Sequence, residues 1–151
     1  MLLNHQAALD YVLNKPDYFR ELTVQKILEI HRFLTKGLGI PNKIRAGRVG
    51  ITGTNYKPLA KANQIQKALQ DLCDLINSKR NVLEKAFIAL LLIAYIQPFE
   101  DGNKRTARII CNALLLPNKY CPISFRTVEP EDYRYATLLF YEQNSIPSFK
   151  K

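Results

Sequence analysis

The feature that most constrains this chain is an uninterrupted apolar stretch, A-F-I-A-L-L-L-I-A-Y-I, from Ala86 to Ile96. Its eleven residues are too few for a transmembrane helix, which needs about 20. A helix that is apolar nearly all round has to be covered by neighbouring elements on every side. We therefore predict a central buried helix over about Val82–Ile96, with the rest of the chain packed around it.

Apolar residues at helical spacing predict five further helices around this one. Pro16, Gly37 and Pro117 are the residues expected to stop three of them, because proline and glycine interrupt helices. The expected helices cover Gln6–Leu13, begin after an N-cap at Thr23, begin near Asn63 with Gln66 completing a capping box, cover Asn103–Leu116, and begin near Pro130.

Residues 40–58 carry a different pattern. Short alternating β-branched residues are interrupted here by Gly47, Gly50, Gly53 and Asn55, which is typical of a small, irregular β-hairpin. The predicted fold class is therefore all-α with one small β-hairpin. Since the 151 residues contain no repeat and no linker composition, we expect a single domain over residues 1–151.

The net charge of +9 invites a nucleic-acid interpretation. Lysine and arginine never occur in runs longer than two, however, so we interpret most of them as a solvated basic surface. This makes a basic nucleic-acid-binding domain the last of the alternatives. Two local groupings stand out: Lys43, Arg45 and Arg48, and then Lys104, Arg105 and Arg108.

The three cysteines lack C-x-x-C spacing, which argues against a disulfide framework or a zinc site and favours a reducing, cytoplasmic compartment. The chain shows neither the pattern of a signal peptide nor an apolar stretch long enough for a membrane span. We therefore expect no membrane association.

The segment after the central helix reads Q-P-F-E-D-G-N-K-R-T-A-R. Gly102 and Asn103 stand where the next helix opens, and unpaired backbone N–H groups and the helix dipole favour an anion there. Lys104 and Arg105 add positive charge at the same end, and Arg108 lies one turn further along. The pattern indicates a phosphate-binding turn.

Asp101 supplies a hard oxygen donor beside this turn, and could hold Mg²⁺ together with phosphate oxygens. Phe99 is expected to anchor the loop in the core, and Glu100 to point outward. His31 lies on an apolar helix face, so we interpret it as a satisfied core residue or a partner-facing one.

The same twelve residues resemble the signature of the Fic family, H-x-F-x-[DE]-G-N-G-R-x-x-R, which lies between two helices. The matching positions are Phe99, Asp101, Gly102, Asn103, Arg105 and Arg108. The segments I-H-R-F-L, G-T-N-Y-K-P and D-Y-R-Y-A-T-L-L-F-Y-E-Q-N-S extend the resemblance to nearly the whole chain. It implies a Fic-like helical fold with a flap at about 44–58 and a motif region at 97–116.

The resemblance also implies an activity: transfer of AMP from ATP, with Mg²⁺, to a Ser, Thr or Tyr hydroxyl of a target protein. Asp101 would bind Mg²⁺, and Arg105 would neutralise the leaving phosphates. The remaining implied nucleotide-binding residues are Gly102, Asn103, Lys104 and Arg108. The flap residues Ile51, Thr52, Gly53 and Thr54 would pair with the target by strand addition.

Two positions depart from the signature. Gln97 stands where the family has a histidine that takes the proton of the attacking hydroxyl. An amide cannot do this, and losing a general base typically costs about 10²–10⁴-fold in rate. Lys104 replaces a glycine, as in the Doc branch, whose members phosphorylate. Since Arg108 is present here and Doc proteins usually lack it, AMP-transfer geometry is favoured over a Doc-like kinase.

The sequence therefore predicts a Fic-type AMP-transferase site with impaired catalysis. The alternative is a nucleotide- or protein-binding pseudoenzyme without turnover. The inhibitory motif [ST]-x-x-x-E-[GN] is not found, and T-V-E-P-E-D at residues 127–132 comes nearest. A restraining glutamate would then come from a separate, antitoxin-like chain. Homo-oligomers occur in the family, so a second copy of the chain is another candidate partner.

Overall fold

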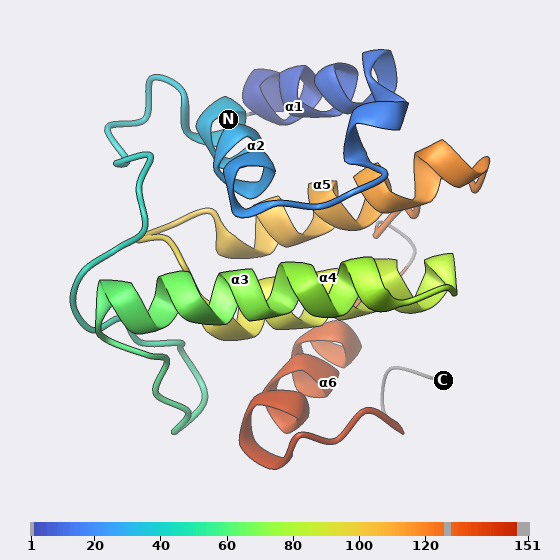
Figure 1. The fold of residues 1–151 in the computed structure, drawn as a ribbon. Coiled ribbons are helices and arrows are strands. Elements are labelled where there is room, and N and C mark those ends of the chain that lie inside the picture. The colour runs from blue at the N-terminus through green and yellow to red at the C-terminus, as the bar shows by residue number, and fades with distance from the viewer. Residues whose placement is uncertain (1, 126–127, 148–151) are drawn as a thin grey trace.

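The computed structural model describes residues 2–125 and 128–147, which form six α-helices and two short 3₁₀ helices (Figure 1). The described residues contain no β-strand. In chain order the elements are α1 (Leu2–Asn14), η1 (Pro16–Phe19), α2 (Val24–Thr35), α3 (Ala62–Ser78), α4 (Val82–Ile96), α5 (Asn103–Leu115), η2 (Leu116–Asn118) and α6 (Pro130–Gln143).

The prediction of a central apolar helix is confirmed by α4, which covers Val82–Ile96 and packs most extensively against α5. The helix begins at Asn81, whose side chain accepts hydrogen bonds from the N–H groups of Leu83 and Glu84. It ends at Gln97, which adopts a left-handed conformation (φ 52°). The first residue of the motif is thus also the C-cap of the central helix.

The other helices surround the α4–α5 pair. Figure 1 shows α1 and α2 together on one side of α5, α3 alongside α4, and α6 on the side away from α1 and α2. One continuous hydrophobic core lies between them and includes residues of all six helices. This arrangement brings the loop between α4 and α5 next to α2 and residues 44–58.

Local sequence signals predicted some helix ends and missed others. Thr23 caps α2 as expected, accepting from the N–H of Lys26 at 3.3 Å. The capping box at Asn63 was wrong, because α3 already begins at Ala62 and the Asn63 side chain accepts only from its neighbour Gln64. The helix α1 begins at Leu2, four residues earlier than predicted, because its first turn carries exposed leucines and no apolar stripe.

The predicted β-hairpin is also wrong: residues 44–58 form an extended loop without a strand. Their hydrogen bonds form no ladder, and some of them run to the motif loop and to α6. Arg45 N donates to Pro98 O at 3.0 Å, Gly47 N donates to Ala60 O at 2.9 Å, and Thr54 Oγ1 donates to Glu142 on α6. We keep the name flap for residues 44–58.

Across the part of the chain that the structure describes, no helix is both long and apolar enough to cross a membrane. The three cysteines are free thiols: Cys73 and Cys111 are buried, and Cys121 is exposed.

Candidate nucleotide-binding site

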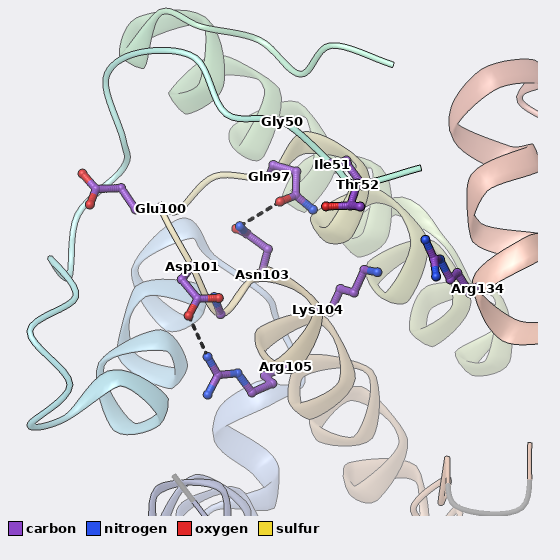
Figure 2. Close-up of a pocket in the computed structure, with 11 residues that line it drawn as sticks. Gly50, Ile51, Thr52, Gln97, Glu100, Asp101, Asn103, Lys104, Arg105 and Arg134 are labelled. Atoms are coloured by element: carbon purple, nitrogen blue, oxygen red, sulfur yellow. Dashed lines mark hydrogen bonds and ion pairs between the residues drawn. The ribbon is translucent and has the colours of Figure 1, made fainter. Parts of the chain in front are cut away.

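A pocket of about 520 Å³ lies between the flap, the motif loop and the first turn of α5 (Figure 2). Polar and charged side chains dominate its wall. The lining residues are Gly50, Ile51, Thr52, Gln97, Glu100, Asp101, Gly102, Asn103, Lys104, Arg105 and Arg134. The pocket therefore brings together most of the predicted site residues, and α6 adds Arg134, which no sequence pattern predicted.

The N-terminus of α5 forms one end of this pocket. Gly102 is the N-cap, with φ 86°, a left-handed conformation that glycine adopts without strain. Its oxygen accepts from Thr106 N at 2.9 Å, so the helix starts at once. The N–H groups of the first turn have no partner within a helix, and together with the dipole they favour an anion.

Asp101 and Arg105 face each other beside this turn. Arg105 Nη2 donates to Asp101 Oδ2 at 3.2 Å (Figure 2). Asp101 Oδ1 also accepts from the N–H of Gly102. The Asp101 side chain is 65% exposed, so this ion pair contributes little stability. Arg105 Nη1 is shielded from solvent and has no hydrogen-bond partner among the described residues.

The oxygen ligands of this pocket would hold Mg²⁺ only together with the oxygens of a bound phosphate. In the described residues, no three His, Cys, Asp or Glu side chains gather as a metal site. Mg²⁺ is nevertheless commonly held by one or two carboxylates together with phosphate oxygens. The exposed carboxylate of Asp101, placed at the helix N-terminus where phosphates would lie, meets this requirement.

The amide of Gln97 is engaged at both ends. Its Nε2 donates to Ala94 O at 2.5 Å. Its Oε1 accepts from Asn103 Nδ2 at 3.0 Å, the bond marked in Figure 2. Tyr141 also donates to Ala94 O, at 3.1 Å, and burial raises the pKa of its phenol well above the usual range. Neither Gln97 nor Tyr141 is therefore equipped to take a proton near neutral pH.

The Asn103 side chain holds the motif loop in place through two hydrogen bonds to the backbone of Phe99. It donates from Nδ2 to Phe99 O at 2.9 Å and accepts at Oδ1 from Phe99 N at 2.9 Å. Phe99 is fully buried, which confirms that it anchors the loop in the core. Only the backbone N–H of Asn103 remains for a ligand, so its expected contribution to the anion-binding turn is through the main chain.

Positive charge gathers on the side of the pocket away from Asp101. The Lys104 and Arg134 side chains approach each other across the pocket (Figure 2). Burial, followed by the nearby charges of Arg108 and Arg134, lowers the pKa of Lys104. An anionic ligand would relieve this repulsion.

Arg108 is not among the residues that line this pocket. Its guanidinium lies 4.8 Å from the ring centre of Phe125 and 5.2 Å from that of Tyr133. It lines a second pocket of about 460 Å³, together with His5 and Asn112. Its Nε is buried without a partner in the described structure. The expected contact between Arg108 and a nucleotide remains a prediction.

The four expected target-binding residues of the flap divide into two pairs. Ile51 and Thr52 line the pocket, whereas Gly53 and Thr54 lie against α6. A side chain at position 53 would come within 3.0 Å of Arg134 Nη2, so the flap passes close to this arginine.

Sequence reasoning missed the contacts that two buried residues make with the site. His31 is fully buried, with Nε2 2.9 Å from Asp101 O, which confirms a satisfied core histidine but places it against the motif loop. Arg45 is 1% exposed and donates to the carbonyls of Gln97 and Gly47, both at 2.6 Å. The only signal for Arg45 was its place in a small basic grouping.

Comparison with known proteins agrees with this geometry. The model of the Fic/DOC family matches residues 21–115. A protein adenylyltransferase Fic from Nematostella vectensis is 32% identical over 119 residues, which are 74% of this chain and 27% of that protein. The protein adenylyltransferase fic-1 from Caenorhabditis elegans is 29% identical over 125 residues, 78% of this chain and 24% of that protein.

Solved structures show the same fold. Fic-1 (residues 134–508) from C. elegans has a TM-score of 0.70 at 22% identity and covers 94% of this chain and 44% of that one. The BepC protein from Bartonella tribocorum, with bound AMPPNP, has a TM-score of 0.71 at 17% identity and covers 97% and 82%. The chain spans about a quarter of the length of the curated relatives named above. With the family model matching residues 21–115, the chain belongs to the Fic/DOC family.

Proposed function

We propose that this chain is a Fic-type AMP-transferase domain whose nucleotide site is retained and whose turnover is weak or absent. Two features support the proposal. The relatives are named protein adenylyltransferases, and the pocket combines a helix N-terminus with Asp101, Lys104 and Arg105. The observation that carries the loss of turnover is the Gln97 amide, held in two hydrogen bonds at the position of the expected base.

In the proposed reaction, the oxygen of a Ser, Thr or Tyr hydroxyl on a target protein forms a bond to the α-phosphorus of ATP. The bond from that phosphorus to the bridging oxygen breaks, and pyrophosphate leaves with the electron pair. Bound Mg²⁺ would neutralise phosphate charge, and Asp101 would hold it. Arg105 and the first-turn N–H groups of α5 stabilise the charge that develops on the leaving group, which is the larger part of such catalysis.

The proton of the attacking hydroxyl has no good acceptor in this site. Gln97 cannot take it, and Asp101 is committed to Arg105 and to the metal. Proton transfer to water alone forgoes about 10²–10⁴-fold in rate. Binding of ATP does not depend on this step, so nucleotide affinity should survive where turnover does not.

The flap supports recognition of an extended target segment. Its residues between Gly47 and Thr54 run beside the pocket and form no ladder with another strand. Unpaired main-chain groups of this kind are a template for strand addition. Target residues paired with Ile51 and Thr52 would bring a hydroxyl to the pocket mouth.

A pseudoenzyme that binds nucleotide without transferring it is the second candidate, favoured by the same immobilised amide at Gln97. A Doc-like kinase would keep the same pocket but move the γ-phosphate. In either case, an antitoxin-like chain or a second copy remains a candidate partner, and the cytoplasm remains the expected compartment.

One experiment separates these activities. The protein is incubated with Mg²⁺ and ATP labelled at the α- or the γ-phosphate, in cell lysate and alone. Transfer of α-label at a low rate supports the AMP-transferase, and ATP binding without transfer supports the pseudoenzyme. Transfer of γ-label alone would identify a kinase. If ATP does not bind at all, the proposal of a nucleotide site is wrong.

A further inference from the structure

His31 does not line the pocket, yet it contacts the loop that forms it. The residue is on α2 and its side chain is fully inaccessible to solvent. Its ring stacks on that of Phe99, with centroids 3.7 Å apart and planes 13° from parallel. The ring also leaves little space at Gly102, where an added Cβ would lie 3.4 Å from His31 Cδ2.

The two ring nitrogens join different segments of the site. Nε2 lies 2.9 Å from the backbone oxygen of Asp101. A carbonyl can only accept, so Nε2 carries the hydrogen in this contact. Nδ1 lies 3.0 Å from the side-chain amide of Asn42, just before the flap. With its hydrogen on Nε2, the ring accepts at Nδ1, so this hydrogen bond requires the amide N–H of Asn42 to face the ring. One buried imidazole thus links the start of the flap to the turn that carries Asp101.

These contacts hold the backbone of Asp101, whose carboxylate is the proposed ligand of Mg²⁺. The carboxylate of Asp101 is exposed and bonded only to its immediate surroundings, Gly102 N and Arg105. Its direction therefore depends on how firmly the backbone of residues 99–102 is held. On the side away from solvent, the holding groups are the ring of His31 and the side chain of Asn103.

We propose that His31 is a positioning residue, which fixes the backbone of Asp101 and so sets the affinity of the site for the Mg²⁺ complex of ATP. The inference rests on the proposed function, in which Asp101 holds the metal. Residues that orient a metal ligand from behind typically contribute 10–100-fold to metal affinity. Since His31 acts through the main chain of Asp101, we expect an effect of about tenfold, the lower end of that range.

Two substitutions distinguish the hydrogen bond that His31 donates to Asp101 O from the stacking of its ring on Phe99. His31→Phe keeps an aromatic ring against Phe99 and removes both hydrogen bonds. His31→Gln loses the ring but can still offer an N–H to Asp101 O. The matched control is Leu69→Ala, which opens a cavity in fully buried α3 packing and leaves the motif loop alone.

The measurement is the Kd of ATP by titration calorimetry, with Mg²⁺ and with EDTA, beside the melting temperature of each variant. We expect His31→Phe to raise the Kd of Mg-ATP about tenfold and to leave the Kd in EDTA within about twofold. His31→Gln should restore most of the Mg²⁺ dependence. Leu69→Ala should lower the melting temperature without changing the ratio of the two Kd values.

The inference is overturned if His31→Phe keeps the wild-type ratio of the two Kd values, or if Leu69→Ala shifts that ratio equally. A wild-type protein that binds ATP equally well with and without Mg²⁺ would also overturn it, while leaving the nucleotide site in place. A wild-type protein that binds no ATP would instead refute the proposed function, together with this inference.

Discussion

Gln97 ends α4 with both ends of its amide in hydrogen bonds and its backbone oxygen held by Arg45. A histidine at this position would have to find its own partners in the same space. Its neighbours Asn103 and Ala94 offer a side-chain amide and a backbone oxygen, so an imidazole has both a donor and an acceptor within reach. In the proposed function, a single substitution at position 97 would therefore supply the general base.

Arg45 offers a prediction about stability. It is buried and donates to three carbonyls, those of Ile96, Gln97 and Gly47. In Arg45→Met these oxygens lose their donor, and we expect the free energy of unfolding to fall by about 2–4 kcal/mol. Urea denaturation measures this. The exposed Arg80→Met is the control, and an Arg45→Met midpoint equal to that of wild type would contradict the prediction.

At the scale of elements, the flap is held from its tip by α6. Glu142 Oε1 accepts from Thr54 Oγ1 at 2.7 Å and from Asn55 N at 3.3 Å. Tyr56, the next residue, donates to Tyr95 O at 2.9 Å. The helix α6 lies outside residues 21–115, which the family model matches, so these contacts connect the flap to a part of the chain beyond the matched segment.

Glu142→Ala should release the flap tip while leaving the fold intact. These contacts are exposed, so we expect global stability to change by no more than about 1 kcal/mol. Local opening should increase instead, and trypsin should cut after Arg48 several-fold faster than in wild type. Glu131→Ala, on the first turn of the same helix, is the control. Equal cleavage rates in all three proteins would show that Glu142 does not restrain the flap.

Across the whole molecule, the sequence predicted the features that depend on local patterns, which are the helices and the motif loop. It missed the contacts between residues that are far apart in the chain. Helical periodicity located α2, α4 and α5 well, and the ordered motif predicted most residues of the pocket. The hairpin failed because glycine and β-branched residues fit an extended loop as well as a strand. His31 was predicted as a core or partner-facing residue, but its contact with Asp101 spans 70 residues of chain, and the contacts of Arg45 with Ile96 and Gln97 span 51 and 52. No local sequence pattern predicted these contacts or the place of Arg134 in the pocket.

The packing of the whole domain can be followed through its thiols. Burial raises the pKa of Cys73 and of Cys111 to about 12 each, so neither is a thiolate at pH 8 in the folded protein. Cys121 is exposed. A thiol reagent at pH 8 should therefore modify one cysteine quickly and the other two only on unfolding. Mass spectrometry of peptides locates the label, and fast labelling of Cys111 in the native protein would contradict this core.

In the proposed function, the chain keeps a nucleotide site and lacks the general base. The first measurement compares the wild-type protein with Gln97→His, using Mg²⁺, ATP labelled at the α-phosphate and cell lysate. We predict about 10²–10⁴-fold more α-label on protein with histidine, while the Kd of ATP stays within a few-fold. Equal transfer by both proteins would contradict the claim, because another group would then be taking the proton.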